Sequence, residues 1–116
     1  MYTLDEARAA LAAVRPRIDA LVDRRADLTE LNVDLLARRS SPFGRLADAK
    51  AAEAWIHAEL ERIAETGVQI KGFAPLLLDY PGERDGVPVL WCWVEGEADI
   101  AWYHRADCGF PGRRRV

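Results

Sequence analysis

The 116-residue chain is poor in cysteine and has no long apolar run. Its two cysteines, Cys92 and Cys108, could form at most one disulfide, and in a chain without a secretion signal we expect both thiols to be reduced. No stretch approaches the roughly 18 apolar residues that a membrane-spanning helix needs, and the first residues lack the pattern of a signal peptide. We therefore expect a cytoplasmic protein with no membrane partner.

An excess of charge of either sign is also missing. The 16 basic and 19 acidic residues are mixed along the chain and give a formal net charge of −3. This distribution offers no broad basic surface for DNA or RNA, so we expect no nucleic-acid partner. Phosphate-binding loops, dinucleotide fingerprints and nucleophile elbows are absent too, which excludes the common nucleotide-binding and hydrolase classes at the level of motifs.

The first half of the chain has the pattern of a long antiparallel helical hairpin. Thr3 and Glu6 are spaced as a capping box, and apolar residues then recur at intervals of three and four, as in a coiled coil. We expect one helix over residues 3–39 and a second over residues 46–66. Pro16 removes a backbone hydrogen bond, so we expect a kink there, with the residues before it lying over the sheet or over a second subunit.

Polar residues interrupt both apolar stripes of this hairpin. Folding the chain at about residue 42 sets Asn32 opposite Glu53 and brings Arg25 and His57 near them. A buried polar layer of Arg25, Asn32, Glu53 and His57 would either fix the register of the two helices or hold a ligand. Both interpretations stay open.

Residues 68–105 are rich in β-branched and aromatic side chains and predict a small antiparallel sheet of three or four strands. We expect turns at Pro81-Gly82, Asp85-Gly86 and Gly96-Glu97. A two- or four-residue loop near Gly96 would place Trp91, Trp93, Trp102 and His104 on one face and Cys92 on the other, whereas a three-residue loop would set Cys92 level with Trp102. The three tryptophans would form a core or wall a pocket.

The complete pattern predicts a single α+β domain over residues 1–116, with a helical hairpin followed by the sheet. Residues 106–116 are rich in glycine and arginine, and we expect an irregular tail that is solvated or wraps an anionic ligand or acidic surface.

Metal-binding residue types gather in the second half of the chain. Asp79, His104 and Asp107 could hold a divalent transition metal ion, although no pair of residues has the spacing of a strong zinc signature. Cys92 and Arg113 are further candidates for binding a metal or ligand. A Cys-His nucleophile pair is not favoured, because Cys92 and His104 face opposite ways in the favoured registers.

The order of several short segments resembles one known family. The matching segments are Tyr2–Ala7, Gly67–Lys71, Leu78–Pro81, Leu90–Trp93, Gly96-Glu97, Ile100–His104 and Gly109–Arg113. On these residues the chain resembles the family of domain of unknown function 2203 (DUF2203) over nearly its whole length. The resemblance implies no particular reaction, but it marks Asp79, Cys92, His104, Asp107 and Arg113 as positions that match the family's pattern.

Two functional hypotheses follow from the sequence. The first is a non-enzymatic binding or assembly module that forms a homodimer through the helical hairpin, or binds another protein, because the apolar stripes are long for so small a sheet to cover. The alternative is a metal-binding protein or metal-dependent enzyme with its site near Asp79, His104 and Asp107.

Overall fold

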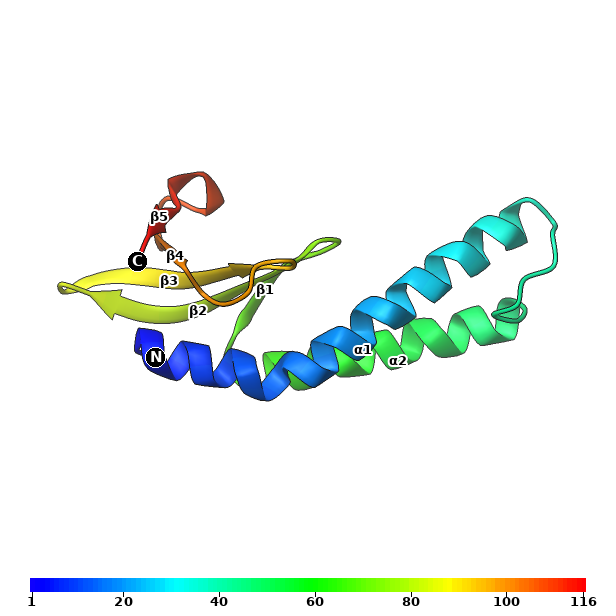
Figure 1. The fold of residues 1–116 in the computed structure, drawn as a ribbon, viewed down its shortest axis with the longest axis horizontal. Coiled ribbons are helices and arrows are strands. Elements are labelled where there is room, and N and C mark those ends of the chain that lie inside the picture. The colour runs from blue at the N-terminus through cyan, green and yellow to red at the C-terminus, as the bar shows by residue number, and fades with distance from the viewer. The chain divides into compact units, whose positions relative to one another are not determined.

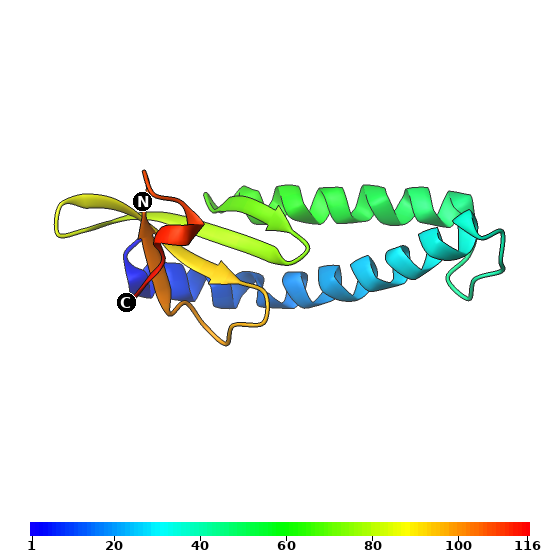
Figure 2. The ribbon, with the colours of Figure 1, turned by 90° about the horizontal axis from the view of Figure 1, so that it is seen from above.

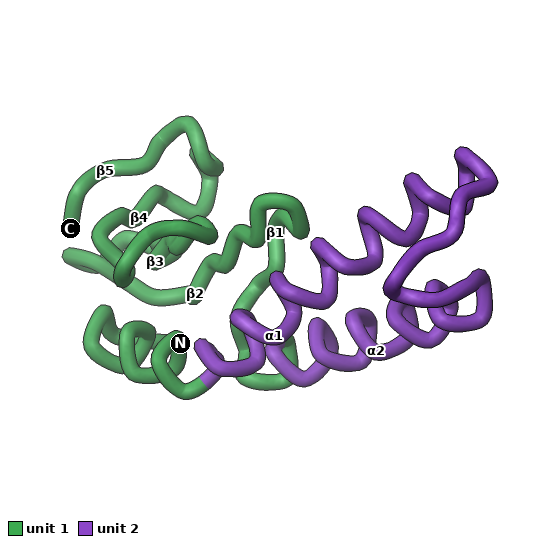
Figure 3. The backbone as a smooth tube through the Cα atoms, turned by 45° about the vertical axis from the view of Figure 1, so that its right-hand side comes forward, with its two compact units in different colours: residues 1–13, 64–116 green, residues 14–63 purple.

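The computed structural model describes residues 1–116 and confirms an α+β fold in which two helices precede an antiparallel sheet (Figure 1). The elements are α1 Leu4–Leu36, α2 Leu46–Ala64, β1 Gln69–Phe73, β2 Leu76–Arg84, β3 Val87–Val94, β4 Trp102–Arg105, the short 3-10 helix η1 Phe110–Gly112 and β5 Arg114–Arg115. The chain divides into two compact units, one of residues 1–13 and 64–116 and one of residues 14–63 (Figure 3). Neither helix is both long and apolar enough to cross a bilayer.

The predicted capping box starts α1. The Thr3 amide donates to the Glu6 carboxylate at 2.9 Å, and the Glu6 amide donates to the Thr3 hydroxyl at 3.1 Å. The helix then runs as one element through Pro16, which differs from the expected kink. Pro16 is exposed, so the carbonyl that loses its partner to the proline ring can be hydrated instead. The helix ends at Leu36, earlier than expected, because Arg38 adopts a left-handed backbone with φ 55°.

The second unit is an antiparallel hairpin of α1 and α2, which lie side by side (Figure 2). Arg17 of α1 donates to the Glu59 carboxylate of α2 at 2.9 Å, and the Arg24 guanidinium lies 4.9 Å from the centre of the Trp55 ring. The buried side chains of this unit are Val14, Ile18, Leu21 and Leu31 from α1 and Ala49, Ala52, Ile56 and Ile63 from α2. Most of them occupy the predicted apolar stripes.

The structure does not form the predicted polar layer in this hairpin. Asn32, Glu53 and His57 are exposed, and Arg25 is only half-buried. Glu53 pairs with Lys50 and His57 with Glu61, in each case on the same helix. The neighbouring Leu31 and Ala52 take the buried positions, because burying an apolar side chain is favourable whereas burying an unpaired amide or carboxylate is costly.

The sheet has five antiparallel strands in the order β1-β2-β3-β4-β5, against the three or four predicted. The additional strand, β5, lies within residues 106–116, where we expected an irregular tail. Gly109, with φ 70°, and the turn of η1 reverse the chain so that Arg114 and Arg115 pair with Tyr103 and Trp102. A strand of two arginines is too short and too polar to be recognised from its pattern.

Pro81 and Gly82 lie inside β2 rather than in a turn, opposite Leu90 and Val89 of β3. The pairing of β1 with β2 ends at Asp79, so β2 has a free edge at Pro81, where the missing N–H costs no ladder hydrogen bond. The Tyr2 amide donates to the Pro81 carbonyl at 2.7 Å and fixes the start of the chain along this edge.

The first turns of α1 lie along one face of the sheet within the first unit (Figure 1). The Trp91 indole donates to the Tyr2 carbonyl at 2.9 Å, and Arg8 donates to the Ile100 carbonyl at 2.9 Å. The buried side chains of this core include Ala7, Leu11, Leu76, Leu78, Tyr80, Trp91 and Trp93. One face of the sheet is therefore the hydrophobic core of this unit.

The shift of the buried stripe by one residue can be tested with a matched pair of variants. We expect Leu31→Ala to lower the free energy of unfolding by about 2–5 kcal/mol, since it opens a cavity between the helices. Asn32→Ala should change it by less than about 0.5 kcal/mol, because Asn32 is exposed. Urea unfolding followed by far-UV circular dichroism measures both, and an equal loss in the two variants would contradict the observed stripe.

Candidate functional site

The register of the three central strands brings three potential metal ligands to one face of the sheet. Cys92 of β3 lies opposite Asp79 of β2 and opposite Trp102 of β4, and His104 lies two residues beyond Trp102. Directly opposed residues share a face, as do residues two apart on a strand. Asp79, Cys92 and His104 therefore point to the same side, the one opposite the helix-covered core.

This register is the one that the sequence did not favour. Cys92 is level with Trp102, so Trp102 and His104 lie on the opposite face from Trp91 and Trp93. The three tryptophans do not line one pocket. Residues 95–101 form a long irregular connection between β3 and β4, in which the Trp93 indole donates to the Glu97 carbonyl at 2.8 Å. Rules for tight hairpins therefore do not apply to this connection.

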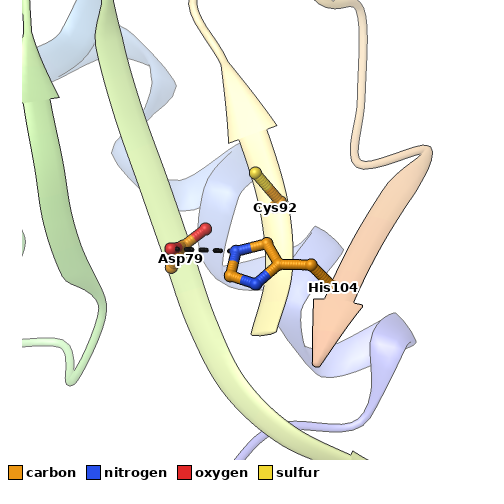
Figure 4. A group of neighbouring side chains, drawn as sticks. All are labelled: Asp79, Cys92 and His104. Carbon is orange, nitrogen blue, oxygen red and sulfur yellow. Dashed lines mark hydrogen bonds and ion pairs between the residues drawn. The ribbon is translucent and has the colours of Figure 1, made fainter. Parts of the chain in front are cut away.

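Asp79, Cys92 and His104 form a compact and fully buried cluster (Figure 4). One potential ligand atom of each residue lies within 4.8 Å of those of the other two, and all three residues are 2% exposed or less. The Nε2 atom of His104 is 3.3 Å from Oδ2 of Asp79, while Oδ1 of Asp79 is buried without a hydrogen-bond partner. A buried carboxylate with an unpaired oxygen is costly unless a cation or proton offsets its charge.

The hydrogen bond at the other ring nitrogen determines the tautomer of His104. Its Nδ1 atom is 2.9 Å from the Arg105 carbonyl oxygen, which can only accept, so Nδ1 carries a hydrogen. In the neutral imidazole, Nε2 then presents a lone pair toward the Asp79 carboxylate, which is also an acceptor. A proton shared between Nε2 and the carboxyl group, or a cation between the two groups, makes this contact favourable. A backbone carbonyl on Nδ1–H is also the usual partner of a histidine that binds metal through Nε2.

The environment of Cys92 favours the neutral thiol. Burial, followed by the negative charge of Asp79 and a hydrogen bond to it, raises the pKa of Cys92 to about 12. The Arg113 guanidinium acts in the opposite direction and lowers this pKa. A neutral thiol is a poor nucleophile, but a bound metal ion would offset the negative charge and deprotonate it.

The C-terminal segment covers this face of the sheet. Arg113 donates to the Glu97 carboxylate at 2.7 Å, and its guanidinium lies 5.1 Å from the centre of the Trp102 ring. A Cβ atom added to Gly112 would be 4.0 Å from the Cβ of His104, so the backbone passes directly beside the histidine. Arg113, one of the positions marked by the family resemblance, therefore lies beside the cluster.

Asp107 does not join the cluster, contrary to the predicted ligand set. It is exposed and accepts hydrogen bonds from Nε and Nη2 of Arg105, which hold its pKa below the usual value. Cys92 joins the cluster because the strands adopt the register that the sequence did not favour, in which Cys92 is level with Trp102. The sequence analysis did not single out Lys71. Its Nζ atom lies 4.0 Å from Oδ2 of Asp79 and places a positive charge at the edge of the cluster.

The fold and the cluster define a small α+β protein with a buried Asp-Cys-His group on the sheet. The chain belongs to the family described as uncharacterized conserved protein (DUF2203), whose model matches residues 1–116. No curated protein matches the chain. No solved structure matches it either.

The two thiols should differ sharply in reactivity. We expect iodoacetamide to alkylate the exposed Cys108 in the native protein at pH 8, while the buried and neutral Cys92 reacts only after unfolding. Mass spectrometry of the peptides measures each site, and Cys108→Ser should leave no thiol that reacts quickly in the native state. Rapid native alkylation of Cys92 would contradict the burial of the cluster.

Proposed function

We propose that the protein binds a divalent transition metal ion through Asp79, Cys92 and His104. The single observation that carries this proposal is the convergence of the three donor atoms within 4.8 Å in a buried site. This set replaces the one predicted from sequence, since Cys92 takes the place of Asp107.

The dimensions of the cluster suit such an ion after a small adjustment. Oxygen, nitrogen and sulfur ligands lie about 2.0–2.3 Å from a tetrahedral zinc ion and hence roughly 3.3–3.7 Å from one another. Side-chain movements of about an ångström would bring the donors to these separations. The ion would offset the charge of Asp79 and accept the Nε2 lone pair of His104, and the Arg105 carbonyl would orient the ring.

The ligand types favour zinc among the divalent ions. A thiolate and an imidazole suit Zn²⁺ better than Mg²⁺ or Ca²⁺, which prefer oxygen ligands. Three protein ligands also leave a fourth position, which catalytic zinc sites keep for water or substrate. A metal-dependent activity would require that water or a substrate can reach this fourth position, which the C-terminal segment covers.

Metal analysis of purified protein tests the proposal. We expect near-stoichiometric zinc in protein prepared without chelator, and its loss in Asp79→Asn, Cys92→Ala and His104→Ala. Added zinc should stabilise the metal-free chain by about 2.7 kcal/mol at a free concentration one hundred times the dissociation constant. Elemental analysis measures the content, and thermal unfolding with and without zinc measures the stabilisation.

Matched controls separate ligation from general damage. Asp107→Asn and Cys108→Ala change the same residue types outside the cluster and should keep the metal. Titration of Co²⁺ adds a readout of the ligand itself, since a thiolate ligand gives a charge-transfer absorption that Cys92→Ala should abolish. If the folded wild-type chain takes up neither ion, Asp79 and His104 form a buried ion pair and the proposal is wrong.

A second candidate function, self-association through the helical hairpin, rests on exposed apolar side chains at the end of the second unit. Val33, Leu36, Phe43 and Leu46 are 52%, 87%, 38% and 61% exposed. Several large apolar side chains exposed near one loop are typical of an interaction surface.

Light scattering tests this second candidate. We expect a homodimer at micromolar concentration, and we expect Leu36→Asp combined with Leu46→Asp to shift the chain toward the monomer, since a buried unpaired carboxylate is costly. Ala54→Asp combined with Ala58→Asp adds the same two carboxylates at exposed positions of α2 and should leave the dimer intact. A wild-type chain that is monomeric at high micromolar concentration would refute the candidate.

A further inference from the structure

We infer that the protein has a second ligand site, which binds a phosphate group in an arginine-lined pocket at the end of the β2–β3 hairpin. The pocket has a volume of about 360 Å³, and its lining includes Arg84, Arg105 and Arg114 together with Val87, Val89 and Tyr103. This volume is in the range of small-molecule sites. The inference is independent of the proposed metal site.

Strand pairing explains why the three arginines share one pocket. Arg84 lies opposite Val87, Val89 opposite Arg105, and Tyr103 opposite Arg114. These pairs lie two residues apart along β3 and β4, so all of these side chains point to the same face. This is the core face of the sheet, which the first turns of α1 cover. The chain begins this cover near Gly82, where Tyr2 bridges to β2, so the end of the hairpin beyond Gly82 is left uncovered.

The state of Arg84 is the observation that points to an anion. Its guanidinium lies 4.3 Å from the centre of the Tyr103 ring, yet its Nη1 atom is buried without any hydrogen-bond partner. A buried donor on a charged group that makes no hydrogen bond is costly, and an oxyanion in the pocket would satisfy it.

The charge balance of the pocket also favours an anion. Its lining holds three guanidinium groups against the single carboxylate of Asp85. Asp107 neutralises Arg105 from outside the lining, which leaves Arg84 and Arg114 as the cations without a carboxylate partner at hydrogen-bond distance. Arginine forks match the geometry of phosphate oxygens, and Val87, Val89 and Tyr103 provide apolar surface for the group that carries the phosphate.

A small phosphate ligand fits these features better than a nucleic acid does. The chain as a whole carries a net charge of −3, and the arginines converge on one pocket instead of forming a basic stripe along the surface. The ligand class is thus inorganic phosphate or a phosphomonoester of small size.

Isothermal titration calorimetry on the full chain tests the inference, with inorganic phosphate and glycerol 3-phosphate as probes. We expect saturable binding that weakens as sodium chloride is added. Arg84→Gln and Arg114→Gln should each lower the affinity about tenfold or more, because each removes charged hydrogen bonds to the phosphate. Tighter binding of the ester would show that the apolar surface contributes, and equal binding would show that the phosphate group alone is recognised.

Two further variants keep the test specific. Arg115→Gln is the matched control, since Arg115 pairs with Trp102 and stacks on its ring at 4.8 Å on the other face of the sheet. It should leave the affinity unchanged. Asp107→Asn should raise the affinity about two- to fivefold by releasing Arg105, an effect that partial unfolding cannot produce.

Binding of neither probe at millimolar concentration would overturn the inference. An equal loss of affinity in Arg115→Gln and Arg114→Gln would also overturn it, since phosphate would then respond to the basic C-terminus as a whole.

Discussion

The pairing of β2, β3 and β4 is the constraint on which the rest of the structure depends. Side chains alternate between the two faces of a strand, so a shift of one residue in either pairing would exchange the contents of the faces. With Asp79 opposite Cys92 and Cys92 opposite Trp102, one face carries the core and the other carries the polar cluster. A shift of one residue between β3 and β4 would move His104 to the core face.

Both proposed sites depend on this pairing, and the arginine pocket depends also on the pairing of β5 with β4. The register that gathers Asp79, Cys92 and His104 on one face gathers Arg84, Arg105 and Arg114 on the other, because the arginines occupy the alternate positions of β2, β4 and β5. Sheets of this kind need only one face for a core. The face opposite the core and the uncovered end of the core face can thus carry ligand sites without loss of the hydrophobic core.

The sequence predicted the helices and strands of this fold better than it predicted which of them lie side by side. Local signals were reliable: the capping box of Thr3 and Glu6 starts α1, and Asp85-Gly86 forms the β2–β3 turn. Pro81 was misleading, since a proline is compatible with a strand wherever no partner needs its N–H, and that depends on where β1 ends. Propensity alone does not contain this information.

The candidate site shows the same division between local and non-local information. Residue types singled out Asp79, Cys92 and His104, but their convergence depends on the irregular residues 95–101, whose path is set by contacts such as the bond from Trp93 to the Glu97 carbonyl. Asp107 was included because it is near His104 in sequence, and its backbone leaves the strand before the side chain can turn inward. Closeness in sequence predicts shared ligation only within a regular element.

The cost of burying the Asp79, Cys92 and His104 side chains indicates that an interaction must offset it. A sheet of this size gains most of its stability from apolar burial, and placing a carboxylate, an imidazole and a thiol at 2% exposure or less reduces that gain. An ion pair between Asp79 and His104, together with the hydrogen bond between Cys92 and Asp79, would recover part of the cost, yet Oδ1 of Asp79 stays without a hydrogen-bond partner. The metal ion proposed above would engage all three residues at once. Ligation would then offset the cost of burial, and the hydrogen bond from His104 to the Arg105 carbonyl would orient the ligating imidazole.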